Sequence, residues 1–207
     1  METLTPEQIE DESMRIIERE AGPHQFKGQE WAVARRIIHA TADFDFIHSL
    51  RIHREAVSAG MAAIRRGCTL YTDTAMLAAG IDGAVTGLTA CSILCCIGDA
   101  DVRRQSAETG ETRSACALRK AAPQLDHGII AIGNAPTALQ EALVLVRNNS
   151  LRPALIIGLP VGFVGAVEAK KMLSREAVPF ITNLSRRGGT AAAAAVIHAL
   201  IRLAADR

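Results

Sequence analysis

Aromatic residues are scarce in this chain of 207 residues: they make up 3% of it, with one tryptophan and one tyrosine. Single-stranded nucleic acids stack their bases on aromatic side chains, so this composition argues against such a partner. An excess of charge of one sign is also lacking, since 23 Lys and Arg nearly balance 22 Asp and Glu. Non-specific attraction to nucleic acid needs a basic surface. We therefore expect no nucleic-acid partner.

Long apolar runs are missing as well. None approaches the roughly 20 residues that span a bilayer. The first residues, METLTPEQIEDES, are polar and acidic, whereas a secretory signal is basic and then apolar. We expect no membrane association and a cytoplasmic location.

The cysteines form no CxxC pair. Their number, five, is odd, and most have apolar or small neighbours, which is typical of free thiols in a reducing compartment. Cys91, Cys95 and Cys96 come close to the spacing of metal ligands, but their neighbours are apolar and buried thiols are the favoured interpretation. We therefore predict no metal site.

Nucleotide-binding motifs are absent too. The chain has no GxxxxGK[ST], and Gly158, Gly162 and Gly165 follow the spacing GxxxGxxG instead of GxGxxG. The next strand ends without the expected acidic residue. Tyr71 is the only tyrosine, so no Tyr-Lys dehydrogenase pair lies on a later helix. NAD and ATP are therefore not expected as cofactors.

What the chain does contain is a helical beginning followed by alternating strands and helices. Thr5-Pro6-Glu7-Gln8 has the order of a capping box with proline at the first helical position, and it predicts a helix over 6–20. Further helices are predicted over 30–40 and 47–66. From Gly67 onward, the predicted strands are 69–73, 88–94, 128–132, 154–158 and 179–182. The predicted helices there are 74–80, 101–123, 137–147, 164–173 and 188–205.

The five strand segments are apolar nearly throughout, as in parallel strands that are covered on both faces. Strand and helix in turn imply right-handed crossovers. The sequence therefore predicts an α/β fold with three layers, a doubly wound and mainly parallel five-stranded sheet, and an N-terminal helical segment. The length suits one domain, 1–207.

Three loops at the predicted carboxyl ends of strands are rich in small residues: 132–139, 158–166 and 185–191. Each precedes a helix, whose first backbone N–H groups attract anions. The alternative is that the glycines only permit tight turns. Because three such loops share one sheet edge, we expect an anionic ligand there.

The segment ARRIIHATADFDF holds a second candidate site. Arg36 and His39 are three residues apart and share one helix face, and Asp43, one turn further, could offset the cationic neighbour. This arrangement suits proton transfer. The alternative is an ordinary helix end, with Asp43 or Asp45 capping the next helix.

Two further polar residues stand out. Ser13 falls on the inward face of the first helix, although a serine there often only bonds the carbonyl four residues earlier. Arg113 follows Gly110 in a Thr-Arg-Ser stretch that opens a helix, and a guanidinium suits carboxylates.

Together these motifs resemble the precorrin-8X methylmutases of cobalamin biosynthesis. The resemblance runs nearly end to end and rests on the segments IEDESM, RRIIHATADFDF, TDTAMLAAGI, ETRSA, AIGNAPTAL, IIGLPVGFVGAVEAKK and RRGGTAAAAAVIHAL. It implies a flavodoxin-like α/β fold, a homodimer with active sites near the subunit interface, and an isomerase that needs no cofactor.

The reaction that the resemblance implies is migration of a methyl group from ring carbon 11 to ring carbon 12 of precorrin-8X, or of cobalt-precorrin-8. The product would be hydrogenobyrinic acid, or cobyrinic acid. By the same resemblance, His39 is the proton donor and acceptor, and Ser13 and Arg36 contact the substrate. Contacts to the substrate's carboxylates are expected from the remaining strand-end candidates, which are Arg113, Asn134, Thr137 and Gly162.

Two alternative functions belong to other classes of protein. The first is a tetrapyrrole-binding carrier that keeps the pocket but performs no chemistry. The second is a nucleotide-dependent α/β enzyme. The sequence leaves open whether the natural substrate carries cobalt.

Overall fold

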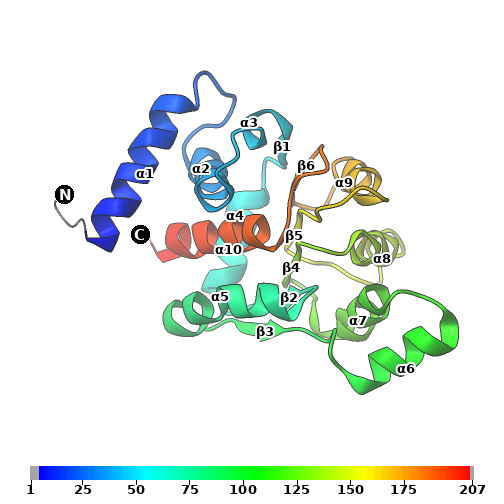
Figure 1. Cartoon of the computed structure of the whole chain (residues 1–207). Coiled ribbons are helices and arrows are strands. Elements are labelled where there is room, and N and C mark those ends of the chain that lie inside the picture. Colours follow the sequence, from blue (N-terminus) through cyan, green and yellow to red (C-terminus); the bar gives the residue numbers. More distant parts are fainter. Residues whose placement is uncertain (1–4, 206–207) are drawn as a thin grey trace.

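The computed structural model describes residues 5–205, and one six-stranded sheet with helices on both faces organises them (Figure 1). The remaining residues of the expected domain, 1–4 and 206–207, lie outside the described part. The strands are β1 (Leu50–Ile52), β2 (Thr69–Thr72), β3 (Ser92–Leu94), β4 (Ile129–Ile132), β5 (Leu155–Gly158) and β6 (Phe180–Asn183). The helices are α1 (Pro6–Glu20), α2 (Gln29–Thr41), α3 (Phe46–Ser49), α4 (Ala56–Arg65), α5 (Ala75–Leu88), α6 (Ala100–Thr109), α7 (Arg113–Ala121), α8 (Pro136–Arg147), α9 (Ala166–Leu173) and α10 (Thr190–Ala205), with a 3₁₀ turn, η1 (Ala122–Gln124).

The strands lie in the order β1-β6-β5-β4-β2-β3. Every neighbouring pair is parallel except β1 and β6, which are antiparallel. Four of the five predicted strand segments contain one of the parallel strands, and the fifth, 179–182, overlaps β6, which extends to Asn183. The expectation of a five-stranded sheet is nevertheless wrong, because β1 adds a sixth strand at one edge.

That sixth strand also corrects the predicted helix over 47–66. The helix α3 ends at Ser49, and β1 then pairs with residues 181–183 of β6 before α4 begins at Ala56. The apolar spacing of this stretch suits a helix locally. The edge of the sheet offers backbone partners to Leu50, which is fully buried there, so tertiary contacts override the local preference.

Two other predicted helices differ from the structure by more than two residues at one end. The helix expected over 101–123 is interrupted at Gly110, which adopts a left-handed conformation (φ 75°) that ends α6. The helix expected over 74–80 continues to Leu88, so the following strand shortens to β3. Glycines at 80, 83 and 87 do not stop α5, because Leu77, Ile81 and Val85 are spaced by four residues and pack into the core.

Two apolar cores lie on opposite faces of the sheet. On β4, Ile129 and Ala131 pack with α2, α4, α5 and α10, while Ile130 and Ile132 pack with α7 and α8 on the other face. Alternate residues of a strand point to opposite faces, so both faces are buried. Helices, sheet and helices form three layers, and α1 lies outside α2 at the periphery (Figure 1).

Candidate active site

The helix α2 carries both Arg36 and His39. Its buried face is apolar (Val33, Ala34, Ile37 and Ile38), and it packs against α10. This packing leaves Arg36 and His39, both half-buried, at the side of the helix that faces α1.

Ser13 of α1 and His39 of α2 line the same cavity, whose volume is about 310 Å³. The rest of its wall is almost entirely apolar and consists of Ile16, Ile17, Ile38, Ala42 and Phe44. The Ser13 hydroxyl donates a hydrogen bond to the Ile9 carbonyl at 2.7 Å. The sequence had left open whether this bond to the carbonyl four residues earlier forms. The Ser13 oxygen can still accept a hydrogen bond from a ligand.

Arg36 lies one turn before His39 but does not line this cavity. Its Nη1 lies 2.8 Å from Glu10 Oε1, and Arg202 of α10 binds the same carboxylate. The hydrogen bond from Arg202 and the charges of both arginines lower the pKa of Glu10, although burial opposes them. Two guanidinium groups share one carboxylate, which leaves a net positive charge beside α2.

His198 of α10 lies close to the same cations. Burial lowers the pKa of this histidine, and the charges of Arg36 and Arg202 lower it further. A neutral imidazole is therefore favoured at position 198.

Asp43 and Asp45 follow the end of α2 and contact a strand-end loop. Asp43 Oδ1 accepts a hydrogen bond from the Asp45 backbone N–H at 3.0 Å, and both carboxylates pair with Arg187. Among residues 5–205, no hydrogen bond or ion pair joins either aspartate to His39, so the structure does not favour the interpretation, left open by the sequence, that Asp43 tunes His39. Asp45 occupies the position before α3, but its side chain makes no capping bond.

The loop between β4 and α8 already holds an anion, because the Asp73 carboxylate is bound there. Its oxygens accept hydrogen bonds from the backbone N–H groups of Gly133, Asn134 and Ala135 at 3.1, 2.7 and 2.7 Å. Burial raises the pKa of Asp73, and these three donors act against that shift. The expectation that this loop offers free N–H groups to a ligand is wrong, since the protein's own carboxylate uses them.

The loop between β6 and α10 is held by a buried cation that sequence reasoning missed. Lys170 of α9 is fully buried, and its Nζ donates to Asn183 Oδ1 at 2.9 Å and to the Arg187 carbonyl at 2.7 Å. Burial lowers its pKa to about 8. Lysine is rarely fully buried. The available signal was its place among the apolar residues of the segment AVEAKKML.

The strand-end candidates gather around these loops and not around His39. Thr137 at the start of α8 accepts a hydrogen bond from Thr112 at 2.8 Å or donates one to it, which brings Arg113 close to α8. Asn134 and Arg113 are exposed. Gly162 donates its N–H to the Arg186 carbonyl at 3.1 Å. None of the four lines the His39 cavity.

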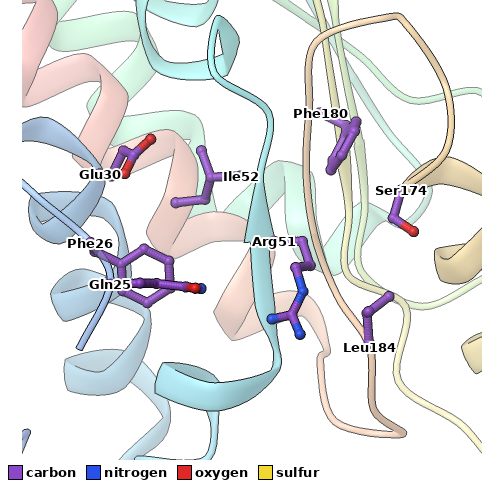
Figure 2. Close-up of a pocket in the computed structure, with 8 residues that line it drawn as sticks. All are labelled: Gln25, Phe26, Glu30, Arg51, Ile52, Ser174, Phe180 and Leu184. Carbon is purple, nitrogen blue, oxygen red and sulfur yellow. The ribbon is translucent and has the colours of Figure 1, made fainter. Parts of the chain in front are cut away.

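A larger cavity, of about 490 Å³, lies beside the edge strand β1 (Figure 2). Its wall combines Phe26, Ile52 and Phe180 with Glu30 of α2 and the Arg51 side chain of β1, whose Nη1 donates to the carbonyls of His48 and Leu50. No histidine lines it, and none of the predicted site residues does either. The smaller cavity is therefore the better candidate for proton transfer.

The five cysteines are free thiols, and Cys96 and Cys116 are buried. Within residues 5–205, no group of three or more His, Cys, Asp or Glu side chains could hold a metal ion. No helix in the same range is long and apolar enough to cross a membrane.

Comparison with known proteins decides the family. A family model described as precorrin-8X methylmutase matches residues 8–203. The chain belongs to the precorrin-8X methylmutase family. The family prediction from sequence motifs is thus confirmed, and the chain is an enzyme, an intramolecular methyl transferase of cobalamin biosynthesis.

Named relatives agree with this assignment. A cobalt-precorrin-8 methylmutase from Leptospira interrogans is 41% identical, over 96% of this chain and 94% of the relative. A precorrin-8X methylmutase from Pseudomonas aeruginosa is also 41% identical, over 81% of each chain. The crystal structure of precorrin-8X methylmutase from Thermus thermophilus is 40% identical, has a TM-score of 0.88, and matches 96% of this chain and 98% of its own.

Proposed function

We propose that this enzyme moves a methyl group from ring carbon 11 to ring carbon 12 of precorrin-8X or cobalt-precorrin-8. The product is hydrogenobyrinic acid or cobyrinic acid, respectively. The observation that carries the proposal is that Ser13 and His39, on different helices, line one apolar cavity. Relatives named for either substrate occur at the same 41% identity, so identity alone does not select between them.

His39 acts as the general acid in this proposal. It lends a proton to the ring system beside the migrating methyl group and takes it back after the shift, so substrate and product have the same composition. Once the macrocycle covers the apolar wall, water is excluded from the imidazole, which strengthens a hydrogen bond between the imidazole and the ring. General acid catalysis by a positioned histidine contributes roughly 100- to 10,000-fold.

Arg36 and Ser13 hold the substrate. The cluster of Arg36 and Arg202 around Glu10 keeps an excess positive charge close to His39, which attracts a carboxylate of the macrocycle. The Ser13 hydroxyl donates to the Ile9 carbonyl, so we assign its oxygen as an acceptor for a donor group of the substrate.

The remaining carboxylates of the substrate are assigned to the strand-end candidates. Arg113 is exposed and forms no ion pair among residues 5–205, so its guanidinium is free to bind one. Asn134 and Thr137 offer side-chain donors, whereas the Gly162 N–H is bonded to the Arg186 carbonyl, so we assign Gly162 a van der Waals contact with the macrocycle. Asp73 uses the N–H groups of residues 133–135, so these contacts come chiefly from side chains.

We also propose a homodimer. The His39 cavity, at about 310 Å³, is much smaller than a tetrapyrrole with its carboxylate side chains, so a second subunit is needed to cover the ligand. Exposed apolar side chains support an interface. Of those in residues 5–205, we assign to it Met76 and Leu88 on α5 and Val161, Phe163 and Val164 in the loop before α9.

We propose three further properties of the chain. One domain over 1–207 is supported by the single sheet and by the family match over 8–203. A flavodoxin-like relationship is supported by the order of the five parallel strands. When β2, β3, β4, β5 and β6 are numbered from 1 to 5 along the chain, their order across the sheet is 2-1-3-4-5, as in flavodoxin. A cytoplasmic location is supported by the free thiols.

The test of the function is conversion of precorrin-8X by the purified chain without any added methyl donor or nucleotide. We expect the absorption spectrum to change to that of hydrogenobyrinic acid while the mass of the compound stays the same. Binding without conversion would indicate a carrier instead of a mutase. Conversion of cobalt-precorrin-8 alone would assign the cobalt-containing substrate.

The dimer is tested by the molar mass in solution. We expect light scattering to give twice the mass of the chain, and Phe163→Glu to shift the protein to the monomer. A wild-type monomer that turns over at full rate would contradict the proposed interface.

A further inference from the structure

The chain leaves α2 through a strained turn immediately after the proposed proton donor. Ala42 has a φ of 51° in the left-handed region, which is unfavourable for a residue with a Cβ. Ala42 and Phe44 both line the His39 cavity. The conformation of this turn therefore shapes the cavity, and other contacts must stabilise it.

Those contacts come from Asp43 and a residue 144 positions away. Asp43 Oδ1 accepts the Asp45 N–H, while Oδ2 pairs with Arg187 Nη1, and Arg187 Nη2 lies 2.5 Å from Asp45 Oδ2. The Asp43 side chain is 19% exposed and that of Arg187 49%. One guanidinium thus binds two carboxylates of the turn.

The backbone of Arg187 is itself fixed from inside the protein. Its carbonyl accepts hydrogen bonds from Lys170 Nζ at 2.7 Å and from Asn183 Nδ2 at 3.0 Å, and both of these residues are fully buried. At the next residue, Gly188 (φ 148°), a Cβ would lie 2.2 Å from the Leu159 carbonyl oxygen. The loop therefore has little freedom to move its arginine.

We propose that Arg187 is a positioning residue, which holds Asp43 and thereby sets the last turn of α2 and the orientation of His39 in its cavity. This inference rests on the proposed role of His39. It assigns a purpose to the buried Lys170 and Asn183, which keep the arginine in place. It also connects the strand-end loops to the cavity, because Gly162 bonds the carbonyl of the neighbouring Arg186.

The kinetic test compares Arg187→Ala with Arg147→Ala. Arg147 forms an ion pair with Glu176 of similar exposure, 47% and 17%, and takes no part in the loops around His39. Ion pairs with an exposed partner contribute little to stability, so both variants are expected to fold. We expect kcat for precorrin-8X to fall about 10- to 100-fold in Arg187→Ala with a smaller change in KM, and to stay at the wild-type value in Arg147→Ala.

Asp43→Asn separates positioning from direct binding of substrate by Arg187. The amide oxygen of asparagine can still accept the Asp45 N–H, but Asp43 loses the charge that pairs with Arg187, and only Asp45 keeps its ion pair with that arginine. We expect a fall in kcat similar to that of Arg187→Ala, no further fall in the double variant, and partial recovery in Arg187→Lys. A normal kcat in Asp43→Asn or in Arg187→Ala would overturn the proposal.

A spectroscopic readout tests position without turnover. The ¹H–¹³C signal of the His39 ring, assigned by its loss in His39→Gln, is expected to move in Arg187→Ala and to stay in place in Arg147→Ala. An unmoved signal in Arg187→Ala would overturn the positioning role. Full activity in His39→Gln would instead overturn the proposed function, and the signal would still report whether Arg187 orients the ring.

Discussion

The cavity around His39 and the loops at the strand ends are built in opposite ways. In the cavity, His39 and Ser13 are half-buried polar groups in an apolar wall, and Arg36 beside them shares its carboxylate with a second arginine. In the loops, two charged side chains, Asp73 and Lys170, are fully buried, and every hydrogen bond they make goes to uncharged groups of the protein.

This difference suits the two regions to different roles, substrate binding and proton transfer in the cavity and structural support in the loops. A group that must bind substrate and move a proton needs hydrogen-bonding capacity that is free in the unbound enzyme, and half-buried side chains retain it. A buried charge has high desolvation costs and tolerates no loss of its partners, so it fixes the surrounding backbone. The glycine-rich loops were the more conspicuous feature of the sequence, yet much of their binding capacity is used internally.

The largest effect on activity is expected at His39. In His39→Ala, turnover of precorrin-8X should fall by roughly 100- to 10,000-fold, because the proposed general acid is lost. Binding of hydrogenobyrinic acid, measured by absorption titration, should persist, because the carboxylate contacts remain. His48→Ala on the exposed surface of α3 is the control and should turn over normally. Normal turnover in His39→Ala would show that the cavity around His39 is not the site of proton transfer.

The largest effect on stability is expected at Asp73. In Asp73→Ala three backbone donors lose their acceptor, and two of these, Gly133 and Ala135, are buried. We expect the free energy of unfolding in urea to fall by roughly 3 kcal/mol or more. Asp126→Ala is the control, since that exposed carboxylate accepts one backbone N–H, from Arg152 at 3.0 Å. Equal losses in the two variants would show that the buried carboxylate does not support its loop.

Lys170 is expected to make stability depend on pH. Its pKa is lowered from 10.5 to about 8 in the folded protein, so the unfolded state binds more protons between these values. Stability relative to Lys170→Met should therefore rise as the pH increases from 8 to 10.5, by at most about 3 kcal/mol. Urea unfolding at several pH values measures this difference. A difference that stays constant would mean that the ammonium is not desolvated.

Ser13 is expected to give the smallest effect. Ser13→Ala removes a hydroxyl that already bonds its own helix, so the free energy of unfolding should change by less than about 1 kcal/mol. If the hydroxyl accepts a bond from the substrate, KM should rise about 2- to 10-fold, the value of one neutral hydrogen bond. An unchanged KM would place Ser13 among the residues that only shape the wall.

Local patterns in the sequence predicted much of the fold. The capping box at Thr5 and Gln8 forms as expected and begins α1. All five predicted strand segments contain or overlap strands. The sixth strand escaped prediction because Leu50–Ile52 has no partner nearby in sequence and is extended by its pairing with β6, about 130 residues later. Likewise, the full length of α5 depends on core packing that outweighs the helix-breaking tendency of its glycines.

In the candidate site, too, local sequence predicted some features and others depended on tertiary contacts. Helical spacing placed Arg36 and His39 on one face of a helix, and motif resemblance assigned the family, which the comparisons confirm. Spacing could not reveal that Glu10 and Arg202 surround Arg36, that Asp73 fills the loop at residues 133–135, or that Arg187 holds Asp43. The sequence alone determined the family and the helix that carries the histidine, because motifs and caps act over a few residues. Tertiary structure decided which charges are paired and which remain available for substrate, because those partners come from segments brought together only when the chain folds.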